Sequence, residues 1–156
     1  MTFEFGAPHL HIREPKYVSV QTPMKVREFL AKRTVSIYGE WHLWVYLCDW
    51  QILSWGKVIA NSESKGKKIK KAISELDGQA LVQVTINPDY SCRFEFDLGG
   101  RLETLPNSEA YEKDAEQWLL YEPSGDVFTL RSDGKYSRMP GNANPDTEKF
   151  EMILKG

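Results

Sequence analysis

The stretch from Trp41 to Trp55 constrains the fold more than any other part of the chain. It holds four of the five tryptophans among aliphatic and other aromatic residues, and Gly39 and Gly56 bound it. Successive side chains of a strand point to opposite faces, and both faces are apolar over the first half of this stretch. The pattern predicts a central strand covered on both sides, with a turn or bulge at Asp49 before the strand continues.

Shorter stretches with strand-forming composition occur on both sides of this segment, separated by turn residues. They cover residues 17–21, 34–38, 80–86, 92–98, 101–105, 118–121, 127–131 and 136–139. Apolar residues alternate strictly over 92–98, where Cys92, Phe94, Phe96 and Leu98 are expected to point inward. Gly99-Gly100 then predicts a two-residue hairpin turn, and the last three strands are expected to form a meander.

One helix is predicted over residues 63–76. Ser62 or Ser64 can cap its start, and Asp77-Gly78 ends it. The apolar residues follow helical spacing and define one buried stripe: Ile69, Ala72, Ile73 and Leu76. Residues 24–31 fit a strand and a helical turn equally well.

The C-terminal residues 140–156 form a tail or a short helix in this interpretation. Asn144 can cap such a helix and Pro145 suits its first position. Phe150, Ile153 and Leu154 would make its apolar stripe. At the other end, residues 1–16 contain Gly and Pro between short apolar steps and are expected to form an arm or an irregular strand.

These elements together predict an α+β fold, mostly antiparallel sheet with the 63–76 helix packed on one face. The 156 residues suit a single globular domain, 1–156, because a chain of this size buries roughly 70% of its unfolded surface. Two cysteines, Cys48 and Cys92, cannot build a disulfide framework and are expected to be buried thiols.

Two classes of partner, nucleic acids and membranes, are disfavoured by the charge balance and by the lack of a long apolar run. Twenty basic residues face 22 acidic ones, without the basic surplus that phosphate binding requires. The predicted helix carries a lysine cluster that is more typical of a solvated helix face than of a phosphate-binding surface: Lys65, Lys67, Lys68, Lys70 and Lys71. No apolar run is long enough to span a membrane, and the N-terminus lacks a signal-peptide pattern, so a cytoplasmic location is expected.

The residues that could carry catalysis form no recognised motif, and neither a cofactor nor a metal is predicted. His9 and His11 share one side of an extended segment, but metal sites usually need three or four ligands. His42 and Asp49 could meet only through the fold. There is no nucleophile elbow and no glycine-rich loop between a strand and a helix.

Three sequence segments resemble those of known proteins: Gly39-Glu40-Trp41-His42-Leu43-Trp44, Phe96-Asp97-Leu98-Gly99-Gly100-Arg101-Leu102 and Gln117-Trp118-Leu119-Leu120-Tyr121-Glu122-Pro123-Ser124-Gly125. They resemble a family of small uncharacterised bacterial proteins and, more loosely, the immunity proteins of polymorphic toxin systems. The resemblance spans about residues 33–136. It implies a β-rich, cytoplasmic protein and no catalytic residues.

Two hypotheses of function follow. The first is a non-enzymatic protein-binding module, in the immunity case a toxin inhibitor, with exposed aromatic anchors and acidic steering residues: Trp50, Trp55, Tyr121, Glu112, Asp114 and Glu116. The alternative is a small-molecule or nucleic-acid binder, or an enzyme without a motif, that uses residues 41–55. A homodimer through an exposed sheet edge is compatible with either.

Overall fold

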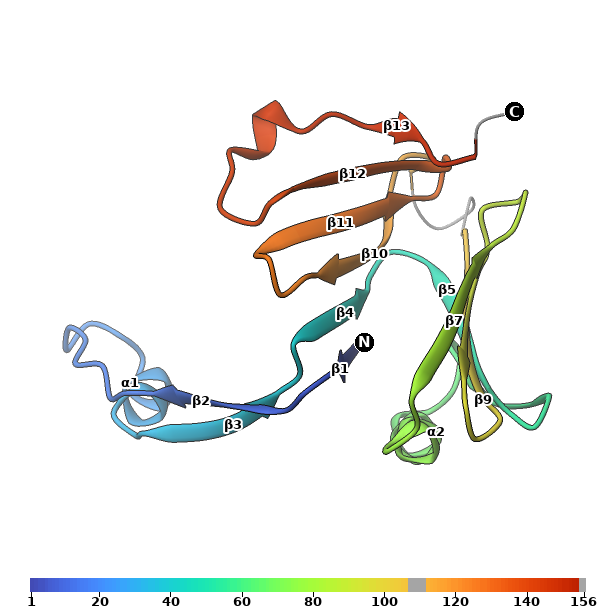
Figure 1. Cartoon of the computed structure of the whole chain (residues 1–156). Helices are drawn as coiled ribbons and strands as arrows, with labels where there is room; N and C mark the ends of the chain where they lie inside the picture. Colours follow the sequence, from blue (N-terminus) through green and yellow to red (C-terminus); the bar gives the residue numbers. More distant parts are fainter. Residues whose placement is uncertain (107–111, 155–156) are drawn as a thin grey trace.

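The computed structural model describes residues 1–106 and 112–154, and over these residues the chain is mostly antiparallel sheet. Strands make up 45% of the structure and two helices 14%, which confirms the predicted α+β class. Two large sheets face each other, and a two-stranded ribbon projects away from them (Figure 1). No helix in the described ranges is both long enough and apolar enough to cross a membrane.

The first sheet has six antiparallel strands in the order β1-β4-β10-β11-β12-β13. Its strands are β1 (Thr2–Phe5), β4 (Trp41–Val45), β10 (Glu116–Tyr121), β11 (Asp126–Arg131), β12 (Lys135–Pro140) and β13 (Glu151–Met152). The predicted C-terminal meander is β10, β11 and β12. The N-terminal strand β1 closes one edge beside β4, so this part of the expected arm belongs to the sheet.

The second sheet has five antiparallel strands in the order β6-β5-β9-β8-β7. Its strands are β5 (Asp49–Ser54), β6 (Lys57–Asn61), β7 (Leu81–Ile86), β8 (Cys92–Phe96) and β9 (Gly100–Leu105). Helix α2 (Gly66–Leu76) contacts β5, β6 and β9. The predicted packing of one helix on one sheet face is confirmed.

The tryptophan-rich segment is divided between the two sheets, whereas the sequence predicted one interrupted strand. Its first half is β4, which is central as predicted because it lies between β1 and β10. The backbone N–H groups of Tyr46 and Leu47 donate to the carbonyls of Gln117 and Glu116, at 2.8 and 3.0 Å. The chain therefore follows β10 for two more residues and then enters the other sheet at Asp49.

Helix α2 starts at Gly66, three residues later than predicted. The Ser64 hydroxyl is engaged with Asn61, whose N–H donates to it at 3.0 Å, and so it closes the turn after β6 instead of capping the helix. Ala72 and Leu76 are buried in the core as predicted. The five lysines predicted on its solvated face are exposed.

The turn between β8 and β9 has three residues, 97–99, rather than the two predicted. Gly99 has φ +82°, a backbone conformation that glycine adopts without steric cost, and this suits the last position of a three-residue hairpin loop. The longer turn leaves Leu98 outside the strand, and its side chain is 59% exposed instead of inward. The inward positions of Cys92, Phe94 and Phe96 are confirmed.

The prediction of a C-terminal helix is wrong beyond the first turn. Asn144 does cap a turn, and its side chain accepts the N–H of Asp146 at 3.1 Å, but the 3-10 helix η1 spans only Pro145–Thr147. The Arg131 guanidinium lies 4.6 Å from the centre of the Phe150 ring and draws this residue toward β11. The chain then runs as β13 along β12.

Residues 7–38 form the ribbon that projects from the sheets in Figure 1, and we call them the distal ribbon. It contains β2 (His9–Arg13), β3 (Thr34–Tyr38) and the short helix α1 (Met24–Leu30) near its tip. Among the described strands, β2 and β3 pair only with each other. The strand-prone stretch 17–21 forms no strand and leads into α1, which resolves the ambiguity at 24–31 in favour of a helix.

A fully buried amide connects the two sheets. Gln117 of β10 donates from Nε2 to the Tyr90 carbonyl at 3.0 Å and to the Arg131 carbonyl at 3.4 Å. Its Oε1 accepts from the hydroxyl of Thr104, which is also fully buried, at 3.4 Å. These bonds join β10 to β9, to β11 and to the turn between β7 and β8.

We predict that Gln117→Met destabilises the protein although methionine has a similar volume. The substitution leaves the Tyr90 carbonyl and the Thr104 hydroxyl without this partner in a buried place, which costs about 2 kcal/mol. Urea unfolding measures the difference. Gln83→Met is the control, because Gln83 is exposed and its amide donates to the hydroxyl of the nearby Thr85 on the same strand. An equal loss of stability in both variants would contradict the prediction.

Candidate binding groove

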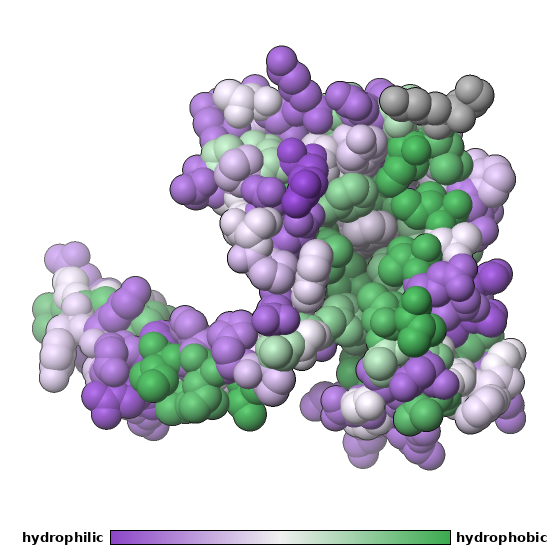
Figure 2. Space-filling model, viewed as in Figure 1, coloured by the Kyte–Doolittle hydropathy of each residue, from purple (hydrophilic) through white to green (hydrophobic). Residues whose placement is uncertain are grey.

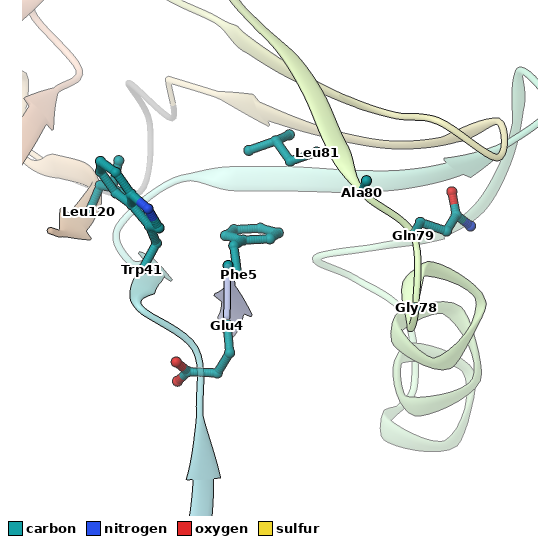
Figure 3. A pocket seen from close by; sticks show the side chains of 9 residues that line it. Glu4, Phe5, Trp41, Gly78, Gln79, Ala80, Leu81 and Leu120 are labelled. Atoms are coloured by element: carbon teal, nitrogen blue, oxygen red, sulfur yellow. The ribbon is translucent and has the colours of Figure 1, made fainter. Parts of the chain in front are cut away.

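An apolar groove lies where the two sheets diverge. It consists of two hollows of about 730 and 340 Å³ that share Phe5, Leu81 and Leu120 in their lining. Figure 3 shows these three side chains around the opening, with Trp41 beside Leu120. In the space-filling view, apolar surface continues between the upper sheet and the right-hand sheet (Figure 2). We call this feature the inter-sheet groove.

One wall of the groove comes from the first sheet. Phe5 lies directly across from Trp41 in the β1–β4 pair, and Leu120 lies across from Leu43 in the β4–β10 pair. Directly opposed residues point to the same face of a sheet, so the register places all four on the face toward the second sheet. Trp41 is 36% exposed and forms part of the rim.

The opposite wall is β7, the edge strand of the second sheet. Leu81, Val84 and Ile86 line the groove. Val84 lies across from Phe94, which fixes it on the core face of the sheet, yet 45% of its surface is accessible. Because β7 pairs only with β8 among the described residues, its outer edge offers backbone groups to another strand.

Polar residues at the end of β7 hold the backbone of this wall. The Ala80 N–H donates to the Asp97 carboxylate at 2.9 Å, and the Asp97 N–H donates to the Ala80 carbonyl at 3.0 Å. The Gln79 side-chain oxygen accepts the N–H of Gly100 at 3.0 Å. These bonds tie the entry of β7 to the hairpin between β8 and β9.

Glu4 and Glu40 fix the point at which the distal ribbon leaves the groove. Glu4 accepts the N–H of Gly39 at 3.1 Å and is ion-paired with the His42 ring, while Glu40 accepts the N–H of Ala7 at 3.2 Å. A Cβ at Gly39 would lie 2.3 Å from the carbonyl oxygen of Phe5, so this close approach of two backbones requires glycine.

The lining of the groove suits apolar contact. Glu122, which lines the smaller hollow, is paired with Arg138 through two bonds of 2.9 and 2.6 Å. No group of three or more His, Cys, Asp or Glu side chains in the described ranges is placed to hold a metal. Both cysteines are buried, as predicted, and burial raises the pKa of Cys48 to about 12 and that of Cys92 to about 11.

The three aromatic anchors proposed from the sequence lie in different places. Trp50 is half-buried against the core. Trp55 is 81% exposed at the β5–β6 turn, has φ +51° and lays its ring over Gly99. Tyr121 is 37% exposed and meets the His42 ring edge-on at 5.4 Å, on the face of β10 opposite to Leu120. They do not form one surface.

The acidic residues proposed as steering charges are also unequal. Glu112 is exposed. Asp114 is exposed and ion-paired with Arg131 at 3.2 Å. Glu116 is half-buried, and its pKa is raised by that burial and by the nearby Glu148, although Arg131 lowers it. The acidic neighbour Glu109 lies outside the described residues.

The histidines do not gather. His9 and His11 lie on the distal ribbon and contact the Tyr38 ring, with centroids 6.4 and 5.4 Å apart. The hypothesis that His42 and Asp49 share a site finds no support, because His42 pairs with Glu4 and Asp49 accepts the Ser62 hydroxyl at 2.9 Å.

Sequence reasoning missed the residues that line the groove, apart from Trp41. Phe5, Leu120 and Val84 are apolar residues in strand-forming stretches, and nothing in that pattern separates a groove wall from a closed core. The one signal was the strand-forming composition of β7 between turn residues, which fits an edge strand as well as a central one.

Comparison with known proteins returns no match: no family model, no curated protein and no solved structure is similar to this chain. The function must therefore be argued from the geometry of the groove and of the surfaces beside it.

We predict that Glu116→Gln stabilises the protein as the pH rises. A raised pKa means that the folded state favours the protonated carboxyl, so this residue's contribution to stability is fully present below its ordinary pKa and is lost as the pH rises through the raised value. Glutamine keeps the neutral form. Thermal unfolding from pH 4 to 8 should give a melting temperature that is equal at pH 4 and higher in the variant at pH 8; Glu112→Gln, at an exposed position, should show no such divergence.

Proposed function

We propose that this chain is a non-enzymatic protein-binding module that receives an extended apolar segment of a partner in the inter-sheet groove. One observation carries the proposal: the groove runs along β7, whose outer edge pairs with no strand of the described residues and whose inner face has accessible apolar side chains. A segment added to that edge gains backbone hydrogen bonds and buries alternate side chains at once.

The dimensions of the two elements agree with this mode of binding. β7 has six residues, enough to pair with an extended peptide of similar length. Side chains of such a peptide point to one face at every second position, where Val84 and Ile86 would meet them. The larger hollow, with Trp41 and Phe5 in its lining, offers a place for one bulky anchor.

The polar residues around the groove support binding rather than chemistry. Glu4 accepts a backbone N–H, Gln79 does the same, and Glu122 is held by Arg138. Each therefore shapes the walls. We propose that affinity comes from apolar burial and backbone pairing and that the charges of Glu112 and Asp114 steer a basic partner. A toxin inhibited by an immunity-type protein is one such partner.

The alternative, a small-molecule binder, draws its support from Trp41. The larger hollow has a volume within the roughly 300–1,000 Å³ typical of ligand pockets, and an indole ring forms part of its rim. A nucleic-acid partner has less support, since the lysines of α2 lie outside the groove lining described above.

A peptide selection tests the proposal directly. A displayed library of random ten-residue peptides is selected on the wild-type chain and counted again on Val84→Asp, which places a charge in the groove at a residue that is already 45% exposed. We expect selected peptides with apolar residues at every second position, and binding weakened at least about tenfold by the substitution, because the charge would be desolvated by the peptide.

Val58→Asp is the matched control. Val58 is also 45% exposed, but it lies on β6, the other edge of the same sheet. Equal loss of binding in both variants, or selected peptides that ignore Val84→Asp, would overturn the proposal. A small molecule retained by the purified wild-type chain and released by Trp41→Ala would favour the alternative.

A further inference from the structure

The distal ribbon carries a second apolar surface that the rest of the chain leaves uncovered. Leu10 lies across from Ile37, and Ile12 lies across from Val35, so the four side chains share one face of the ribbon. They are 66%, 69%, 53% and 59% exposed, respectively. Apolar side chains gather on the lower side of the ribbon in Figure 2. We call this surface the aliphatic face.

The opposite face of the ribbon already has a partner. Arg13 alternates with Ile12 and therefore points the other way; its guanidinium donates to the Phe29 carbonyl at 2.8 Å and lies 4.0 Å from the centre of the Phe29 ring. Arg13 thus ties helix α1 to the polar face of the ribbon. A two-stranded ribbon without a covered apolar face is only marginally stable in water, so the aliphatic face needs a cover from outside.

Charge separates the ribbon from the rest of the chain. Residues 7–38 contain six lysines and arginines against two glutamates, while the remaining residues contain 14 lysines and arginines against 20 aspartates and glutamates. Glu122 lies in the lining of the inter-sheet groove, where its carboxylate is paired with Arg138. Two basic ribbons would repel each other, whereas a basic ribbon is attracted to the acidic body that contains the groove.

From these observations we infer that the occupant of the groove in the isolated protein is the distal ribbon of a second copy of this chain. The aliphatic face of each copy covers the groove of the other, and one strand of the ribbon pairs with the β7 edge. The inference rests on the proposed function of the groove and identifies a partner for it. It covers the aliphatic face and the inter-sheet groove with a single contact.

The connection between ribbon and body suits a reciprocal exchange. Gly6 lines the larger hollow, so the ribbon departs from the rim of its own groove. It continues the antiparallel pair of β1 and β4 beyond Phe5 and Trp41 and projects away from the sheets (Figure 1). Two copies that exchange such ribbons form a closed dimer with twofold symmetry, a common outcome of swapped elements.

The ribbon is large enough for a stable interface. Interfaces of standard size take about 20–30 residues from each partner. Residues 7–38 supply that number before the groove residues of the same copy are added, and a reciprocal exchange uses both surfaces of each copy.

Sedimentation equilibrium tests the inference. We expect the wild-type chain to be a dimer, and expect Ile37→Asp on the aliphatic face and Val84→Asp in the groove each to weaken the dimer at least about tenfold by burying an unpaired charge. Val58→Asp, on the opposite sheet edge, should leave the dimer unchanged. Circular dichroism confirms that each variant is folded.

Mixing the two monomeric variants gives the sharper result. A pair of Ile37→Asp and Val84→Asp subunits retains one intact contact, between the ribbon of the second and the groove of the first, so the mixture should form more dimer than either variant alone. In a dimer of ribbons packed on each other, mixing would rescue nothing and Val84→Asp would have no effect. Either of these results overturns the inference.

Engineered cysteines locate the contact. A copy with Val35→Cys mixed with a copy with Val84→Cys should give a disulfide-linked dimer on mild oxidation, while either alone should not. The native thiols are buried and do not compete. A wild-type chain that stays monomeric at high concentration, or a Val35→Cys chain that cross-links alone, contradicts the inference. If peptides still bind the groove in that case, the proposed function stands and only its second-copy occupant is lost.

Discussion

The arrangement of the two sheets depends on the buried amide of Gln117. This side chain joins β10 to β9 and to the Tyr90 turn, and close by the Phe94 and Trp118 rings meet edge-on at 5.5 Å. The sheets are therefore closed at the start of β10. Toward Leu120, three residues further along, a hollow separates β10 from β7, and no described hydrogen bond joins the two strands across it. The Gln117 amide bonds groups of both sheets and so fixes the distance between the sheets at this end of β10. At the Leu120 end the sheets diverge, and the groove lies between them.

The groove and the distal ribbon both follow from one feature of the topology, the length of the N-terminal antiparallel pair. β1 and β4 form the inner half of a long antiparallel pair, and β2 and β3 form its outer half. The inner half buries Phe3 and Leu43 in the core, whereas the outer half projects away from the two sheets and leaves its aliphatic face exposed (Figure 1). Within the described residues, β4 has the short strand β1 on the side opposite β10, and β7 has β8 on one side and no strand on the other. Uncovered apolar surface on the ribbon and uncovered apolar surface in the groove thus arise together.

Local sequence patterns correctly predicted the features of the fold that depend on residues close together in the sequence. The alternation of β8, the buried stripe of α2 and the glycine and proline turns of the meander specified an antiparallel α+β fold, and the structure confirms it. The division of residues 41–55 between two sheets was not predictable in this way, because both halves have the composition of a buried strand and the change of sheet depends on the remote carbonyls of Glu116 and Gln117. Gln117 directly precedes the predicted strand 118–121, and nothing in the local pattern indicates a buried amide there. The candidate site shows the same limit of local patterns. Trp55 is conspicuous by residue type, whereas Val84 and Leu120 differ from core residues only because no other part of the described structure covers them.

Apolar alternation predicts that one face of a strand is buried, but it does not indicate whether this chain or another molecule covers that face. Leu10 and Ile12 follow the same pattern as Phe94 and Phe96, yet the first pair is exposed and the second buried. Where one groove can accept either a neighbouring ribbon or a segment of another protein, the two occupants compete, and the apparent affinity for the foreign segment falls as the concentration of this chain rises. Self-association would then set a threshold that a foreign partner must exceed. The shared requirement, an extended apolar segment, follows from Val84 and Ile86 on the wall of the groove.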